Sequence, residues 1–102
     1  MARSPIRYEL AAVEELQQAV DWYRQRDERV AQRLIQIVRK KLSEIRARPR
    51  SWAADSFGAR RVRVGQFPYV IVFVIHRRTV VFIAFAHTSR DPGYWHSRLQ
   101  GR

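Results

Sequence analysis

Two nearly continuous apolar stretches in the C-terminal half of the chain constrain the fold most strongly. Residues Tyr69–Ile75 and Val80–Ala86 are rich in valine, isoleucine and phenylalanine, and only four residues, beginning at His76, separate them. Such runs are typical of central strands that are buried on both faces or nearly so. The sequence therefore predicts a β-hairpin at the centre of a sheet.

The first half of the chain changes from a strand period to a helical period. Alternation of apolar and polar residues predicts a short strand within Ser4–Leu10. From Ala11 the apolar residues recur every three or four positions, which predicts an amphipathic helix that ends near Arg24. A longer helical pattern covers Glu28–Arg48, and Pro49 ends it. Two adjacent amphipathic helices form an αα-hairpin, and its apolar side needs a sheet to cover.

A further alternating segment, Arg61–Val64, predicts a strand with one basic face and one apolar face, followed by a turn at Gly65–Pro68. The order β-α-α-β-β-β predicts an α+β fold, with the helical hairpin packed on one face of an antiparallel sheet. A length of 102 residues suits a single domain that spans the whole chain. Residues from Ser97 onward are expected to form a short, frayed C-terminal tail.

The positive charge is large and unevenly distributed. The chain has 20 Lys+Arg residues and 9 Asp+Glu residues, for a formal net charge of +11. The first 30 residues contain five arginines and six acids, so the excess lies beyond Val30. A field of this kind attracts polyanions or acidic protein segments. We therefore expect an anionic partner that binds the C-terminal two-thirds of the chain.

Several classes of function are disfavoured by what the sequence lacks. Without cysteine there is no disulfide framework, thiolate zinc site or cysteine nucleophile. The three histidines lack the spacing of metal ligands, and no glycine-rich phosphate loop is present, so neither a metal nor another cofactor is expected. No apolar stretch approaches the roughly 20 residues that span a bilayer. We expect a cytoplasmic protein with no membrane partner.

The densest cluster of polar and aromatic residues is His87–His96, which directly follows the last apolar stretch. Functional side chains collect where a rigid strand ends in a loop. Arg90 at this position is suited to hold a phosphate or a carboxylate. His87 has the pKa range of a general acid or base, although a hydrogen bond to the backbone is the simpler expectation. For Trp95 we expect packing as a C-terminal anchor.

A set of residues spread along the chain forms one pattern: Glu14, Leu16, Ala19, Trp22, Tyr23, Pro49, Trp52, Arg61–Val64, Phe67–Tyr69, Ile71, His87, Arg90, Asp91, Pro92 and Trp95. In this order and spacing, these residues resemble the RelE/ParE superfamily, the toxins of type II toxin-antitoxin modules that are often labelled plasmid stabilisation proteins. The resemblance covers nearly the whole chain. It implies a toxin that arrests growth, neutralised by a cognate antitoxin whose acidic, partly disordered segment folds on binding within a higher-order complex.

The two branches of this superfamily imply different roles for the same residues. In the RelE-like branch the toxin is a ribosome-dependent mRNA interferase, and the matching positions would be catalytic: Arg61, Arg63 and Arg90 on the phosphate, with Tyr94, His96 or His87 moving the proton. In the ParE-like branch the toxin inhibits DNA gyrase and breaks no bond. There the same surface would contact the target, through Arg60, Arg61, Arg63, His87 and Arg90.

One departure favours the ParE-like branch. The arginine that the nuclease branch carries on its third strand is replaced here by Val70, next to Tyr69. A gyrase inhibitor does not need that catalytic arginine. A plain nucleic-acid-binding module that uses the same basic surface is a further alternative, although it does not account for the family pattern.

Overall fold

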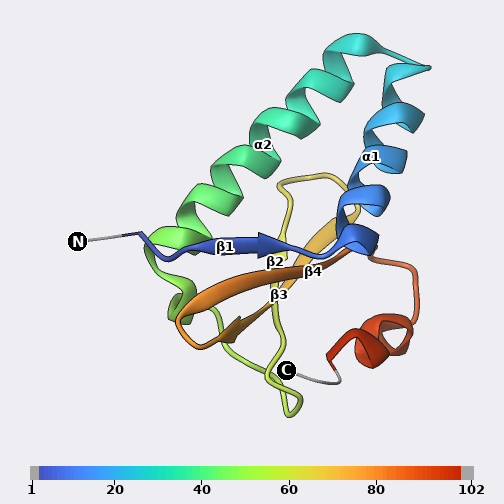
Figure 1. The fold of residues 1–102 in the computed structure, drawn as a ribbon. Helices are drawn as coiled ribbons and strands as arrows, with labels where there is room; N and C mark the ends of the chain where they lie inside the picture. The colour runs from blue at the N-terminus through green and yellow to red at the C-terminus, as the bar shows by residue number, and fades with distance from the viewer. Residues whose placement is uncertain (1–2, 100–102) are drawn as a thin grey trace.

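The computed structural model describes residues 3–99 and shows a helical hairpin above a four-stranded sheet (Figure 1). The order β-α-α-β-β-β is confirmed, and the α+β class with it. The elements are β1 (Ile6–Tyr8), α1 (Leu10–Arg24), α2 (Glu28–Ala47), the short 3-10 segment η1 (Pro49–Ser51), β2 (Arg60–Arg63), β3 (Tyr69–His76), β4 (Thr79–His87) and the 3-10 segment η2 (Pro92–Leu99).

The helices begin and end near the expected residues for identifiable reasons. Asp27 caps α2 by accepting a hydrogen bond at 2.9 Å from the backbone N–H of Arg29. Pro49, which cannot donate a backbone hydrogen bond, follows two residues after the helix ends. Within residues 3–99, neither helix is both long enough and apolar enough to span a bilayer.

The sheet has the strand order β1-β4-β3-β2. Its centre is the expected hairpin of β3 and β4, which turns at Arg77 and Arg78. Both turn residues have positive φ (50° and 69°), as a two-residue turn between twisted strands requires. The antiparallel expectation holds for β2, β3 and β4. It is wrong for β1, which pairs with β4 in parallel; the long connection through both helices and two strands allows this pairing.

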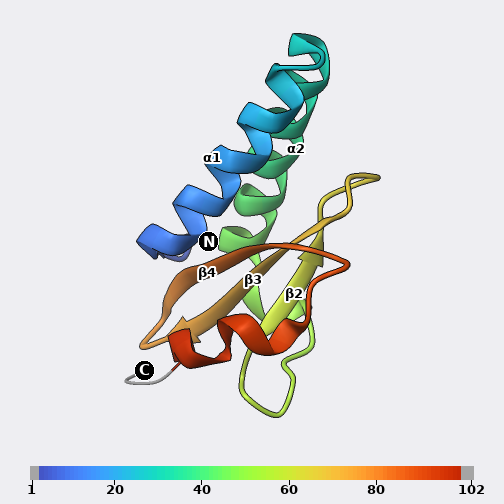
Figure 2. The same ribbon diagram turned by 90° about the vertical axis from the view of Figure 1, so that its right-hand side faces the viewer.

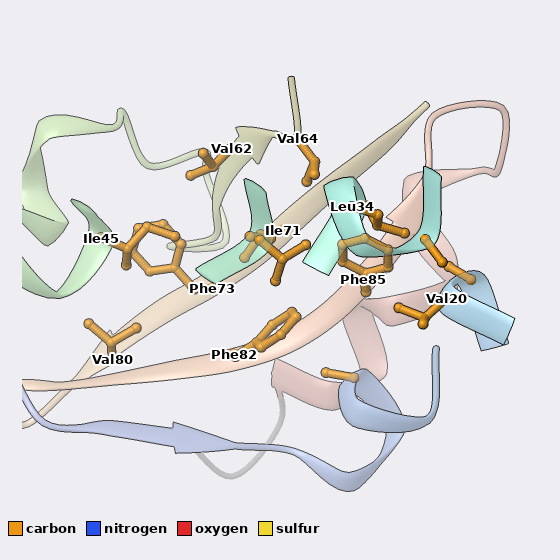
Figure 3. Close-up of a cluster of buried hydrophobic side chains, with 14 residues drawn as sticks. Val20, Leu34, Ile45, Val62, Val64, Ile71, Phe73, Val80, Phe82 and Phe85 are labelled. Atoms are coloured by element: carbon orange, nitrogen blue, oxygen red, sulfur yellow. The ribbon is translucent and has the colours of Figure 1, made fainter. Parts of the chain in front are cut away.

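A β-bulge in β4 keeps the helix-facing side of the sheet apolar. The register with β3 shifts between Val72 and Phe73, so Phe82 and Phe85, three residues apart, both face the helices. They pack with buried residues of α2 such as Leu34 and Ile45 (Figure 3). This cluster is the main core of the protein.

The opposite face of the sheet is covered by the C-terminal segment η2 (Figure 2). Trp95 is 1% exposed and packs on a second cluster that includes Val72, Ile83 and Ala86. The expectation that Trp95 anchors the C-terminal segment is therefore confirmed. The expectation of a frayed tail from Ser97 is wrong as far as Leu99, because η2 continues to that residue. Residues 100–102 lie outside the described part of the chain.

An ion pair joins η2 to α1 across the edge of β4. Arg98 forms two hydrogen bonds with the carboxylate of Glu15, at 2.9 and 3.0 Å. Since β1 pairs with β4 only as far as Phe82, the next part of this edge lacks a strand partner. Glu15 instead accepts from the backbone N–H of Phe85, and Arg98 donates to the carbonyl of Ile83. We call this arrangement the Glu15–Arg98 clasp.

The clasp predicts that Glu15 contributes more to stability than its neighbour in α1. Glu15→Ala leaves the Phe85 N–H without an acceptor and the Arg98 guanidinium without its carboxylate, which should lower the free energy of unfolding by about 2 kcal/mol. The control Glu14→Ala removes the same charge from an exposed position and should change it by less than ~0.5 kcal/mol. Urea unfolding of both variants measures the difference, and equal effects would show that the clasp is not stabilising.

Candidate functional site

The basic residues of β2 divide between the two faces of the sheet. Arg61 and Arg63 are exposed and lie on the face that η2 partly covers, opposite Val72 and Val70 of β3. Arg60 lies on the other face, where its guanidinium donates to the carbonyl of Trp52. The structure thus presents Arg61 and Arg63 to solvent as expected, whereas it gives Arg60 a part in holding the loop before the strand.

Arg61 and Arg90 come together at one small pocket. The pocket has a volume of about 140 Å³, and His87 and Trp95 also line it. The guanidinium of Arg61 lies 3.9 Å from the carboxylate of Asp55, so this ion pair is long and weak. Arg90 is exposed and carries no ion pair within residues 3–99. The pocket therefore joins two predicted arginines from separate elements at the end of β4, while Arg63 does not line it.

His87 and Arg90 also line a larger groove of about 490 Å³. We call it the aromatic groove, because its walls include Trp22 and Tyr23 of α1 together with side chains of β3 and β4. The full lining is Glu15, Gln18, Trp22, Tyr23, Pro68, Tyr69, Phe85, His87 and Arg90. Its combination of aromatic walls with a cation at one end suits an apolar side chain next to an anionic group.

Glu15 is a site residue that the sequence reasoning missed. Ala12, Glu15 and Ala19 recur at helical spacing, and both alanines are buried. A carboxylate on the buried stripe of an amphipathic helix needs a cationic or N–H partner. This pattern in α1 was the available signal, although nothing in the sequence identified Arg98 as the partner.

His87 is held by its own loop. Its Nδ1 accepts a hydrogen bond at 3.0 Å from the backbone N–H of Ser89, whose hydroxyl oxygen lies 2.8 Å away. The ring also packs edge-on against Tyr69. The expected backbone hydrogen bond is thus confirmed. Because Nδ1 is occupied as an acceptor, Nε2 is the ring nitrogen left for a ligand.

Tyr94 is close to the arginines but is not suited to accept a proton near neutral pH. Its ring stacks under the guanidinium of Arg90, with 3.6 Å between the guanidinium carbon and the ring centroid. Burial, followed by the negative charge of Glu15, raises the pKa of Tyr94 to about 12. Tyr94 therefore supports Arg90 as a neutral aromatic surface.

His96 lies apart from the two arginines. Its ring packs on Phe57, with 4.5 Å between ring centroids, and edge-on against Trp95. It lines neither the small pocket nor the aromatic groove. Across residues 3–99, no group of three or more histidine, aspartate or glutamate side chains is placed to hold a metal ion.

The raised pKa of Tyr94 predicts a specific titration. The difference in absorbance at 295 nm between the wild type and Tyr94→Phe should have its midpoint near pH 12, rather than at the ordinary tyrosine value of about 10. The wild type should also lose stability relative to Tyr94→Phe as the pH rises from 10 to 12, since the unfolded chain releases this proton first. A midpoint near pH 10 would show that Tyr94 is solvated.

Comparison with known proteins assigns the chain to a family. Residues 6–92 match the family model described as "ParE toxin of type II toxin-antitoxin system, parDE". Among solved structures, a chain of the chromosomal ParDE toxin-antitoxin system from P. aeruginosa is similar at a TM-score of 0.72 and 12% sequence identity, over 83% of this chain and 96% of that one. No curated protein gives a significant match. The chain belongs to the ParE toxin family of type II toxin-antitoxin systems.

Proposed function

We propose that this toxin inhibits DNA gyrase through the surface around Arg61 and Arg90, and that a cognate antitoxin neutralises it. The observation that carries the proposal is the convergence of these two arginines with His87 on one pocket. Arg63, exposed on the same face of β2, extends the cationic surface. Guanidinium groups held in this way suit carboxylates or phosphates on the target.

The chemistry around these arginines supports binding over bond cleavage. Cutting RNA at its 2′-hydroxyl needs a group that takes a proton near neutral pH. The high pKa of Tyr94 opposes that role, and His96 packs on Phe57 away from the arginines. Val70 occupies the place where the nuclease branch has a third arginine. Of the three candidate proton carriers only His87 lies at the pocket, and without a third arginine on the phosphate this set of residues favours a toxin that acts by contact alone.

The aromatic groove is the surface best suited to the antitoxin. Tyr23 and Pro68 also line a neighbouring hollow of about 390 Å³, whose other walls include Val30, Ile37 and Phe67. The two hollows thus adjoin along the side of the helical hairpin. An amphipathic segment that folds on binding needs such apolar anchoring sites, and Arg90 and Arg33 supply partners for its acidic side chains.

The gyrase proposal predicts that Arg61→Gln combined with Arg90→Gln weakens inhibition of supercoiling by about two orders of magnitude. Each substitution removes a charge-assisted contact of ~1.5 kcal/mol. The control Arg77→Asn with Arg78→Asn removes two charges from the β3–β4 turn, where asparagine tolerates the positive φ. It should inhibit like the wild type. An equal loss of supercoiling inhibition in both double variants would show that net charge alone causes the effect. Cleavage of mRNA on ribosomes without gyrase inhibition would contradict the proposal.

A second prediction concerns neutralisation. Expression of the toxin alone should arrest bacterial growth, and co-expression of its antitoxin should restore it. Trp22→Ala removes an exposed wall of the aromatic groove and should weaken antitoxin binding by about tenfold while leaving gyrase inhibition intact. Normal growth with abundant folded toxin and no antitoxin would contradict the toxin proposal. If Trp22→Ala left the affinity for the antitoxin unchanged, the antitoxin would bind outside the aromatic groove.

A further inference from the structure

The outward face of α2 is a second basic surface, separate from the pocket at the end of β4. Arg29, Arg33, Arg39 and Lys40 are all exposed, and we call them the α2 basic face. The apolar residues of the same helix, such as Leu34 and Ile45, point into the main core (Figure 3). One face of the helix is therefore buried in the core, and the opposite face is exposed to solvent.

These charges are largely unpaired. Within residues 3–99, Arg33, Arg39 and Lys40 have no carboxylate within 4 Å. Arg29 has a weak partner, Asp27 at 3.6 Å, but its side chain is 90% exposed. Gln32 and Gln36 lie between these cations on the helix, and both are exposed. The acids of α2 on this side, Glu28 and Glu44, already have partners: Glu28 accepts from Arg24 and Gln32, and Glu44 lies 3.3 Å from Lys41.

We propose that the α2 basic face binds the phosphate backbone of duplex DNA without sequence preference. From Arg29 to Lys40 the helix advances about 16 Å, over which one strand of B-DNA presents about five phosphates. The backbone of the helix is already ordered before binding. The conformational entropy lost on binding is therefore mainly that of the basic side chains. The inference does not depend on gyrase being the target.

Two other ligands fit this face less well. An acidic peptide that folds on binding must bury apolar side chains, and the α2 basic face borders an apolar hollow only beside Arg33, at the surface proposed for the antitoxin. An unpaired strand needs aromatic side chains on which its bases stack. The exposed face of α2 has no aromatic residue. A duplex, which presents only regularly spaced phosphates, needs neither feature.

The test is the fluorescence anisotropy of a labelled DNA duplex of 20 base pairs, titrated with the full chain between 50 and 200 mM KCl. The wild type should bind with an affinity that falls steeply with salt. Arg39→Gln with Lys40→Gln should weaken binding by about tenfold and reduce the slope of log K against log [salt] by about 2, because two phosphate contacts are lost. Glutamine retains helix propensity, and circular dichroism checks folding.

The matched control is Arg77→Asn with Arg78→Asn, which lowers the net charge equally at a distant turn. It should keep most of the affinity and a slope close to that of the wild type. Equal losses in the two double variants would assign the binding to net charge and overturn the proposal. Tighter binding of a single strand of the same sequence, or a loss confined to Arg61→Gln with Arg90→Gln, would also overturn it.

Discussion

The arrangement of the site depends on how the open edge of β4 is satisfied. β1 is only three residues long, so it leaves the backbone groups of Ile83 and Phe85 without a strand partner on that side. Unpaired backbone groups are costly when buried and prone to aberrant pairing when exposed. The Glu15–Arg98 clasp satisfies both groups and fixes α1 against η2. That junction borders the aromatic groove, because Glu15 lines it.

The apolar and cationic surfaces of the structure meet at Arg90, which lines the aromatic groove. Aromatic side chains gather in the groove beside α1, whereas exposed arginines gather on β2, at Arg90 and on α2. The guanidinium of Arg90 lies 3.6 Å from the centroid of the Tyr94 ring, and that of Arg98 lies 5.2 Å from the same centroid. The Tyr94 ring therefore links the clasp to Arg90. In the function proposed above, the antitoxin and the target would both use Arg90, because it lines both the aromatic groove and the small pocket.

The parts of the fold that could be predicted from sequence are those set by local pattern. The apolar runs predicted the bounds of β3 and β4 to within one or two residues, and the helical period predicted both helices. The parallel pairing of β1 could not be predicted, because nothing local to Ile6–Tyr8 specifies which neighbour it joins. Likewise, the role of Arg60 depends on its hydrogen bond to the carbonyl of Trp52 in the preceding loop. The ordered structure of η2 depends on the contact between Arg98 and Glu15, which lie 83 positions apart in the sequence.

Hydrogen-deuterium exchange of the toxin with and without DNA gyrase tests most directly whether the surface around Arg61 and Arg90 is the target-binding surface. Binding there should slow exchange in β2, at the end of β4 and in the loop from His87 to Pro92, while α2 exchanges as in the free toxin. Protection confined to other elements, or none at saturating gyrase, would contradict this assignment.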